Sequence, residues 1–451
     1  MTTTQPRTGL IAGAAFAGTA IEFYDFFIFG TATALVFGKA FFGHYGGSRG
    51  TLALGATYAV AFIARPIGSI VFGHVGDRLG RKKTLVFTLG LMGTSTFAIG
   101  LFPDFDSIGV AAPIILVCLR FLQGLAVGGE WAGAALPAAE FAPPGRRGLY
   151  SMLTQLGPPV AFGFSALTFL VVFKATGDPT KNSAFQNWGW RIPFLASIVL
   201  VAVGLWIRLK IEETPVFAAA LDRAAPARVP VRQAFAAQWR QILLAGGMLS
   251  GLFAFFYIGT VFLSGYAGKN PRGVPPGVLG LSTTEILTVQ IIAAGVFLVG
   301  VVVSGLYCDR LGRRGFVLAA NAGAVVIGLI LFSIVDGHGR TGFAIGLSLM
   351  LGSVGVVYGP LAAFLPELFA TRYRYTAAGL GYNLGGVIGG AIPILIAHQI
   401  LKHANSFVLG AYLSVLAALS TACVLALTDT RGVDITGAFG APVPGVAAVT
   451  A

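Results

Sequence analysis

Long apolar runs separated by short polar segments make up most of the chain. Each run holds roughly 20 or more mostly apolar residues, the length that a helix needs to cross the hydrocarbon core of a bilayer. A helix is required there because lipid offers the backbone no hydrogen-bond partner. The pattern predicts an all-α membrane protein with twelve transmembrane helices, at about residues 10–37, 51–75, 84–102, 110–136, 150–174, 190–209, 241–267, 282–307, 315–335, 341–363, 374–400 and 406–427.

The composition excludes an ordinary soluble protein. The chain is 56% hydrophobic and 10% charged, whereas roughly 25% of residues are charged in an average soluble domain. The first apolar run is too long for a cleaved signal peptide, so we expect it to stay in the mature protein. No polar stretch is long enough for a soluble catalytic domain, and no nucleophile or metal-ligand pattern is visible, so neither an enzyme nor a metal site is expected. The three cysteines are far apart and are predicted to serve packing.

The net charge of +13 is distributed by side of the membrane. An even number of spans puts both termini on one side, and nineteen of the thirty Lys and Arg fall on that side. The positive-inside rule therefore predicts cytoplasmic termini in the plasma (inner) membrane, with the lipid bilayer as a partner. A nucleic-acid partner is not expected, because no loop combines basic residues with stacking aromatic side chains.

An internal repeat organises the chain. "GHVGDRLGRKK" at 73–83 returns as "GLYCDRLGRRG" at 305–315, each between the second and third spans of its half. Six spans plus six spans then form two parallel repeats, an arrangement of carriers that rock two bundles about a site at the midplane. The predicted units are an N-terminal six-helix bundle, a cytoplasmic linker, a C-terminal six-helix bundle and a disordered cytoplasmic tail, at residues 1–209, 210–240, 241–427 and 428–451.

Charged residues inside the spans are confined to the first half. Glu22 and Asp25 stand three residues apart and share a helical face. Their repeat-related positions in the second half are uncharged, and Arg65 and Arg120 have no Arg counterparts either. A charge at this depth costs about 2.5 to 3.5 kcal/mol on insertion scales and normally faces an interior cavity or another charge. These four residues are therefore predicted to form a site, the alternative being ion pairs that only join helices.

The fourth span carries a polar stripe. In "RFLQGLAVGGEWAG", Arg120, Gln123 and Glu130 recur at helical spacing along about 15 Å, at 1.5 Å rise per residue. Gly124 and Gly128 beside the stripe predict close packing against a neighbouring helix. Together with Arg65, these groups and the first-span carboxylates predict a cluster that can hold a proton and an anion at once.

Several motifs resemble those of the major facilitator superfamily. The two copies of G-x-x-x-D-R-x-G-R-R/K between spans two and three of each half match its loop signature. "IEFYDF", "ARPIG", "RFLQGLAVGGEWAG", "EETPVF" and "ELFATRYRYTAAGLGYNLGG" resemble one branch, the metabolite:proton symporters, which includes carriers for 2-oxoglutarate, citrate, shikimate and proline or betaine. The resemblance covers all twelve spans and implies the fold of that superfamily.

The resemblance also implies a conformational latch. Its expected members are Asp77, Arg78, Arg81 and Glu140 in the first half, and Asp309, Arg310, Arg313 and Glu367 in the second. Each Asp would accept hydrogen bonds from free N–H groups at a helix N-terminus, where the macrodipole also favours negative charge. Asp309 would face the start of the fifth span near 149–151, and Asp77 the start of the eleventh near 374–376. Arg81 and Arg313 would pair with Glu140 and Glu367.

By the same resemblance, Asp25 and Glu22 are the proton-coupling candidates. Arg120 and Arg65 would bind the substrate anion or relay charge, and the pocket would also include Gln123, Glu130, Tyr382 and Asn383. Arg120 suits a carboxylate because its planar fork can bond both oxygens. The alternative for Arg120 is a structural partnership with Glu130 or Asp25. No cofactor other than the proton, as coupling ion, is expected, and the carrier is predicted to work as a monomer.

The sequence leaves three modes of transport open. Import of a small organic anion with a proton is favoured over import of a zwitterionic osmolyte, because the tail lacks the heptads of a coiled coil that often accompanies osmolyte carriers. Gly157-Pro158-Pro159 in the fifth span partly matches the Gly-Pro motif of proton antiporters in the same superfamily, although two prolines bend a helix whatever its function.

Overall fold

A computed structural model describes residues 8–45, 47–79, 81–140, 142, 145–177, 184–210, 230–268, 279–370 and 374–430 of the chain. Within these residues all regular secondary structure is helical, apart from one isolated bridge between Gly268 and Leu281. Twelve helical segments are long and apolar enough to cross a membrane. The predicted number of spans is therefore confirmed.

The first six spans include several interrupted helices. Their elements are α1 (Thr8–Ala32) with η1 (Thr33–Phe37) and α2 (Gly38–Ala40), α3 (Gly47–Leu79), α4 (Arg81–Leu101), α6 (Ala111–Glu140), α7 (Arg147–Gln155) with α8 (Gly157–Thr176), and α10 (Ile192–Lys210). Short helices between them are η2 (Gly43–Tyr45), α5 (Phe105–Ile108), α9 (Ala184–Asn187) and η3 (Gly189–Arg191). The fifth span is broken at Leu156, directly before the Gly-Pro-Pro sequence, because proline cannot donate the helical hydrogen bond to the preceding turn.

The last six spans follow the same plan. They are α12 (Pro230–Tyr257) with η4 (Ile258–Phe262) and α13 (Leu263–Ala267), α14 (Thr283–Leu311), α15 (Arg313–Gly337), α16 (Gly339–Glu367), α17 (Arg374–Gly386) with η5 (Val387–Ala391) and α18 (Ile392–His403), and α19 (Ser406–Ala426). The described end of the predicted linker is the start of α12, whose backbone is non-helical at Gln238 (φ −137°, ψ 27°). The first span of each half and the eleventh span each contain a one-turn π-helix, a feature often found at functional sites.

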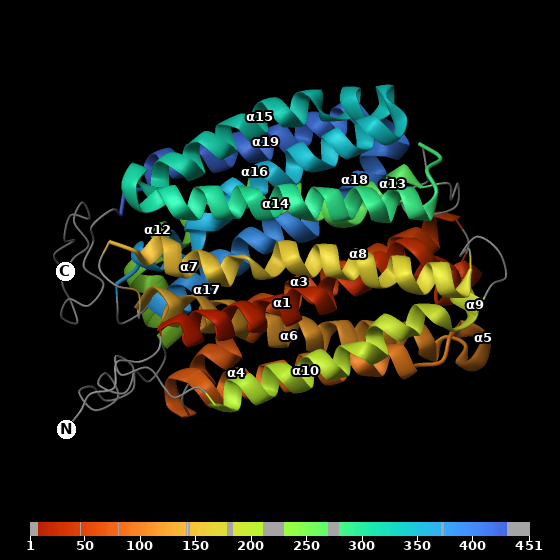
Figure 1. The fold of residues 1–451 in the computed structure, drawn as a ribbon, viewed down its shortest axis with the longest axis horizontal. Coiled ribbons are helices and arrows are strands. Elements are labelled where there is room, and N and C mark those ends of the chain that lie inside the picture. The colour runs from red at the N-terminus through yellow and green to blue at the C-terminus, as the bar shows by residue number, and fades with distance from the viewer. Residues whose placement is uncertain are drawn as a thin grey trace.

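The spans lie side by side and run from end to end of the molecule (Figure 1). Helix α1 begins and α19 finishes at the same end, which we call the terminal end. Large apolar side chains are exposed around the outside, among them Phe87, Val199 and Val415 at 61%, 63% and 65%. An apolar exterior of this kind matches a lipid environment.

Glycines permit the close packing of two helices and a sharp turn between two others. A Cβ at Gly124 or Gly128 of α6 would overlap the backbone of Ala61 or Arg65 on α3, so the predicted close packing is present. Gly312 between α14 and α15 has φ of 97°, a conformation that side chains other than glycine rarely adopt. In the second half, the Gly of the loop signature therefore makes the sharp turn between two spans.

Candidate functional site

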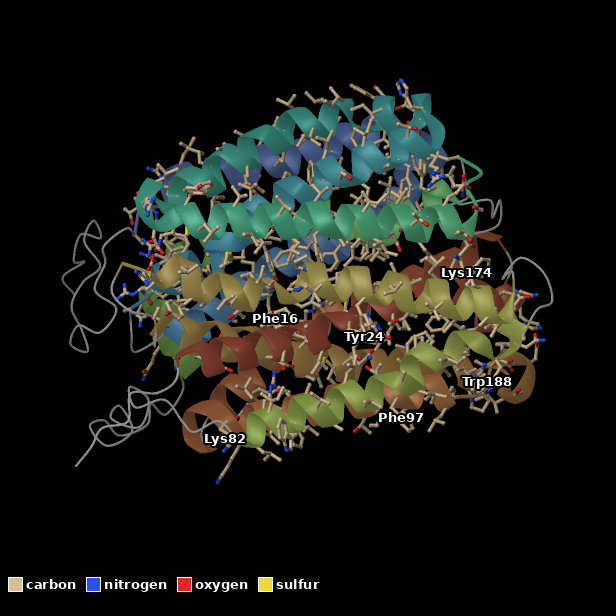
Figure 2. All side chains as sticks on the ribbon, in the orientation of Figure 1. Phe16, Tyr24, Lys82, Phe97, Lys174 and Trp188 are labelled. Atoms are coloured by element: carbon tan, nitrogen blue, oxygen red, sulfur yellow. The ribbon has the colours of Figure 1, made fainter. Side chains whose placement is uncertain are left out.

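The charged residues of the spans lie deep inside the bundle. Glu22 and Asp25 on α1, Arg65 on α3 and Arg120 on α6 are 3%, 1%, 6% and 2% exposed. Figure 2 shows Tyr24, the neighbour of Asp25, between Lys82 at the terminal end and Lys174 at the opposite end. The predicted cluster is therefore sequestered from both surfaces.

A chain of hydrogen bonds joins Arg120 to Asp25. Arg120 Nη1 donates to Gln123 Oε1 at 2.8 Å, and Gln123 Nε2 donates to Thr96 Oγ1 at 2.7 Å. Thr96 Oγ1 in turn donates to Asp25 Oδ2 at 2.9 Å. The side chains come from α6, α4 and α1, so a cation and a carboxylate on different helices are connected through two neutral groups. Sequence analysis missed Thr96, because a threonine inside a span usually bonds only to its own helix.

Arg120 keeps one edge of its guanidinium group free. Its plane is stacked over the ring of Phe29, with Cζ 3.7 Å from the ring centroid. Its Nε and Nη2 are buried and have no hydrogen-bond partner among the described residues. Nε–H and Nη2–H point the same way along one edge, which is the geometry that binds both oxygens of a carboxylate. The structure thus places a guanidinium edge that has no acceptor among the described residues beside the ring of Phe29.

Arg65 connects the two halves of the molecule. Its Nη1 donates to the hydroxyl of Tyr257 on α12 at 2.9 Å, and its Cζ lies 4.5 Å from the ring centroid of Phe62. The ring of Tyr257 stacks on Phe253, which in turn meets Tyr382 edge to face at 5.0 Å. An arginine of the first half therefore faces an aromatic cluster of the second half.

Tyr382 and Asn383 on α17 lie at this interface. The hydroxyl of Tyr382 is 2.8 Å from that of Tyr358 on α16. Asn383 Nδ2 donates to the carbonyl of Gly128 on α6 at 3.2 Å and to that of Gly379 on its own helix at 2.9 Å. Asn383 thus joins the halves through backbone, while Tyr382 belongs to the aromatic cluster that Arg65 faces.

Glu130 has a partner that sequence analysis did not identify. It is fully buried and forms an ion pair with Arg208 of α10, which also donates to the carbonyl of Leu85 at 2.6 Å. Arg208 stands two residues before the end of α10, yet it is only 8% exposed. Among the described residues, the suggested pairing of Arg120 with Glu130 is not found: Arg120 donates to Gln123, and Glu130 pairs with Arg208. The alkyl stem of Arg208 reaches inward from the helix end and brings its charge to Glu130.

The Glu130–Arg208 pair predicts a large stability effect. Arg208→Leu leaves the Glu130 carboxylate buried without its cation, and removing one partner of a buried pair costs about 3 to 5 kcal/mol. We expect a clearly lower midpoint of thermal unfolding in detergent. The double variant Arg208→Leu/Glu130→Leu should recover much of the loss, and a single variant as stable as the parent chain would show that the pair is structurally unimportant.

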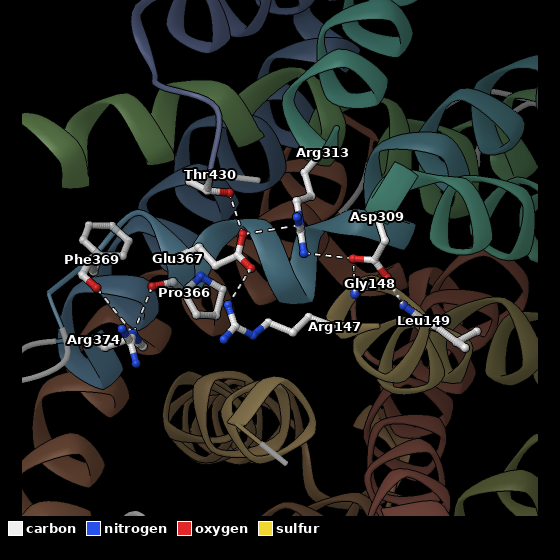
Figure 3. Close-up of polar contacts among 10 residues, drawn as sticks. All are labelled: Arg147, Gly148, Leu149, Asp309, Arg313, Pro366, Glu367, Phe369, Arg374 and Thr430. Atoms are coloured by element: carbon white, nitrogen blue, oxygen red, sulfur yellow. Dashed lines mark hydrogen bonds and ion pairs between the residues drawn. The ribbon is translucent and has the colours of Figure 1, made fainter. Parts of the chain in front are cut away.

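A second polar cluster lies at the terminal end (Figure 3). Asp309 accepts from the backbone N–H groups of Gly148 and Leu149, at 3.0 and 3.2 Å, at the start of α7. Arg313 lies 2.9 Å from Asp309 and 3.4 Å from Glu367. The predicted contact of Asp309 with the fifth span and the predicted pairing of Arg313 with Glu367 are both present.

Two further groups enter this cluster. Arg147 lies 3.8 Å from Glu367, so Glu367 of α16 also faces the first half. Thr430 is 1% exposed and donates to Glu367 Oε2 at 2.5 Å. We predicted a disordered tail from residue 428 onward, but the first residues of that segment are held in place by this buried bond (Figure 3).

Fewer contacts are described for the other predicted latch residues. Arg310 is exposed. The side chains of Asp77, Arg78, Arg81 and Glu140 lie outside the described part of the structure, so their contacts stay predictions. Arg374, expected to face Asp77, donates from Nε to the carbonyls of Pro366 and Phe369 at 3.2 and 3.4 Å.

The Asp309 contact predicts how the terminal end opens. Asp309→Ala removes two charge-assisted hydrogen bonds between the halves, each worth about 1.5 to 3 kcal/mol. In a variant without Cys118, Cys308 and Cys423, a cysteine in place of the buried Ser151 of α7 should react with a maleimide at least tenfold faster when Asp309 is Ala. A cysteine at buried Ser197 of α10 is the control, and equal labelling at position 151 would argue against a latch.

The comparisons with known proteins agree with this architecture. The sequence profile of the family described as "Sugar (and other) transporter" matches residues 10–235 and 241–436. The inner membrane metabolite transport protein YhjE of Escherichia coli is 39% identical over 423 residues, which cover 93% of each chain. The shikimate transporter of the same organism is 34% identical over 86% of each chain, and its proline/betaine transporter is 30% identical over 94% of this chain and 84% of its own.

A solved structure shows the same fold. The proton:xylose symporter XylE of E. coli, a member of the major facilitator superfamily, superposes with a TM-score of 0.76. The match covers 95% of this chain and 98% of that one at 17% identity. The predicted fold class is therefore confirmed.

Proposed function

Because the chain belongs to the sugar (and other) transporter family of the major facilitator superfamily, and within it to the metabolite:proton symporter group, we propose that it imports a small organic anion together with a proton. Its family membership makes it a transporter and not an enzyme. The observation that carries this proposal is the buried hydrogen-bonded chain from Arg120 to Asp25. It places an anion-binding group and a titratable carboxyl in one network inside the bilayer, where ionisable residues normally mark substrate and ion pathways.

The free edge of Arg120 supports an anionic substrate. A buried guanidinium with two nitrogens that have no acceptor among the described residues loses hydrogen-bond energy until a ligand supplies acceptors. A carboxylate supplies two oxygens at the spacing of Nε and Nη2. Arg65, whose Nε also lacks a partner within the described chain, adds positive charge on the neighbouring helix α3. The substrate is therefore proposed to be a mono-, di- or hydroxy-carboxylate.

The carboxyls of α1 support proton coupling. Asp25 Oδ1 and Glu22 Oε2 are buried and have no hydrogen-bond partner in the described part of the chain. A carboxylate in such a place is poorly compensated for lost hydration, and a proton removes its charge. Protonation and substrate binding would together neutralise the cluster, so the loaded carrier could rearrange without carrying uncompensated charge.

Alternating access gives the terminal cluster its role. Contacts of Asp309, Arg147 and Tyr375 with the other half hold the terminal end closed. In the proposed orientation this end is cytoplasmic, the membrane is the inner membrane, and the protein works as a monomer. Release of the substrate to the cytoplasm would then require these contacts to separate.

A zwitterionic osmolyte is the second candidate. A relative 30% identical to this chain is named a proline/betaine transporter. Such a substrate also carries a carboxylate for Arg120, and its cationic nitrogen suits the aromatic rings around Phe26 and Tyr257. The acid remains the first choice, because two arginines and unpaired guanidinium nitrogens favour net negative charge.

Uptake into liposomes tests the proposal. Purified protein, an inward proton gradient and labelled 2-oxoglutarate, citrate, shikimate, benzoate, proline and betaine are the components. Accumulation of one acid that collapses when the gradient is dissipated is the expected result. Accumulation of proline or betaine alone would establish the second candidate, and export of a hydrophobic cation under the reversed gradient would indicate antiport.

A further inference from the structure

Thr96 stands between the two charged groups that the proposed function couples. Its oxygen accepts from Gln123, which accepts from Arg120, and its hydroxyl donates to Asp25 Oδ2. Thr96 is fully buried. Water is therefore a poor substitute for its contacts, and the charge state of Asp25 must be accommodated by Thr96 itself.

The hydroxyl of Thr96 has a second acceptor within reach. Besides Asp25 Oδ2 at 2.9 Å, the carbonyl oxygen of Met92 on the same helix lies at 3.1 Å. A hydroxyl carries one proton and two lone pairs, so it donates to one of these acceptors at a time. Rotation about the Cβ–Oγ bond exchanges them without moving a heavy atom.

We propose that Thr96 is the positioning residue that transmits the charge state of Asp25 to Arg120, by donating to Asp25 when that group is ionised and to Met92 when it is protonated. The inference rests on the proposed function and names the internal link that such coupling needs. When Asp25 takes up a proton, its new O–H donates to Thr96, whose hydroxyl then turns to Met92. Thr96 accepts from Gln123 in both states, and its own hydroxyl has an acceptor in both.

The direction of the hydrogen bonds explains the coupling. With Asp25 ionised, the bonds from Arg120 to Gln123, from Gln123 to Thr96 and from Thr96 to Asp25 all point from cation to anion, and aligned bonds of this kind polarise one another. Protonation reverses the last bond and removes the anion. The positive charge of Arg120 is then less compensated and binds the substrate anion more tightly, and by reciprocity the bound anion favours the proton.

Other charged and titratable groups near Asp25 lie on several elements. Glu22 and Tyr24 share its helix, and Glu130 approaches from α6. Arg208 of α10 and Arg65 of α3 act on the same cluster through Glu22, and Tyr257 of α12 faces Arg65. None of these is hydrogen-bonded to Asp25 in the described structure. A substitution of Thr96 alone therefore separates the effect of the hydrogen-bonded chain from the electrostatic effect of the surrounding charges.

Infrared titration of the purified protein tests the relay without a substrate. The carbonyl band of protonated Asp25 is assigned by its loss in Asp25→Asn, and the guanidinium band of Arg120 by its loss in Arg120→Lys. The test variant is Thr96→Val, which keeps the shape and removes the hydroxyl. Thr96→Ser retains the hydroxyl, and Thr88→Val is the matched control, since Thr88 is fully buried on α4 and donates to its own helix at Leu85.

In the parent chain, Thr96→Ser and Thr88→Val, we expect the Arg120 band to change with the same pH midpoint as the Asp25 band. In Thr96→Val the ionised carboxylate loses its donor, so the Asp25 midpoint should move to higher pH by about one unit or more, and the Arg120 band should no longer follow it. An Arg120 band that still follows Asp25 in Thr96→Val overturns the inference.

Two further outcomes keep the test decisive. If Thr96→Val does not fold, Gln123→Met cuts the same chain on its other side. There the Arg120 band should become independent of pH while the Asp25 band still titrates, and an Arg120 band that still follows Asp25 overturns the inference. Failure of the proposed function is a separate result, because it appears in liposomes as the absence of proton-driven uptake by the parent chain.

Discussion

Replacing Arg120 by lysine is expected to weaken binding of the transported acid by about 100-fold. Lysine keeps the positive charge but not the planar fork, so the substrate carboxylate loses one of two charge-assisted hydrogen bonds and the alignment of the other. Stacking on Phe29 and the bond to Gln123 are lost as well. A loss of about 3 kcal/mol corresponds to this factor at 1.4 kcal/mol per tenfold change. The Michaelis constant for counterflow in liposomes measures it.

The chain offers a matched control for this change. Arg191 also stacks on an aromatic ring, that of Trp190 at 4.3 Å, but it lies at the opposite end and donates to backbone carbonyls. Arg191→Lys should leave the Michaelis constant within about twofold. If Arg120→Lys also stays within twofold, Arg120 contributes only charge, and the free edge of its guanidinium group is not where the substrate binds.

The architecture was predictable because long apolar runs directly identify the segments that cross the membrane. The third span was predicted at 84–102 and is α4, Arg81–Leu101, and the tenth was predicted at 341–363 and is α16, Gly339–Glu367. Both helices begin before their predicted starts, since the helical backbone includes polar or charged positions that do not add to the apolar run. The Asp309 and Arg313 contacts followed from the resemblance of the loop motif to that of the major facilitator superfamily, because the motif places those side chains at the turn between two spans.

Partners on different helices were not predictable. Glu130 and Arg208 are 78 residues apart, and a lysine or arginine near the end of a span has the same sequence context whether it faces the headgroups or folds inward. Thr96 was missed for a related reason. The bond to its own helix at Met92 is the ordinary behaviour of a threonine in a span, and its bonds to Asp25 and Gln123 depend on the packing of α4 against α1 and α6.

The one-turn π-helices were also outside the reach of the sequence. Gly30 precedes one of them and Gly259 lies inside another, but glycine is frequent throughout this chain, which contains 63. A π turn inserts one residue without changing the apolar pattern, so periodicity does not reveal it. In the first span of each half, the extra residue changes which side of the helix faces the other half beyond the π turn. The proposed transport cycle requires the two halves to move relative to each other at these spans.

Asp25→Asn is expected to abolish proton-driven accumulation while leaving exchange of substrate across the membrane. Asparagine has nearly the same shape, and its carbonyl oxygen can still accept from Thr96, so the hydrogen-bonded chain to Arg120 should persist. It carries no charge in any state and takes up no proton in the transport cycle. Accumulation under an imposed pH gradient should fall about 100-fold, to the level of empty liposomes, whereas counterflow of labelled for unlabelled substrate should stay within a few-fold of the parent chain.

Glu22→Gln separates the two carboxyls of α1. Glu22 lies one helical turn away from Asp25, and no hydrogen bond connects it to the Arg120 chain among the described residues. We therefore expect Glu22→Gln to reduce the rate of uptake while retaining accumulation. If Asp25→Asn still concentrates substrate and Glu22→Gln does not, the coupling proton resides on Glu22. The charge relay would then have to run through Arg65, which lies near Glu22 and reaches the second half through Tyr257.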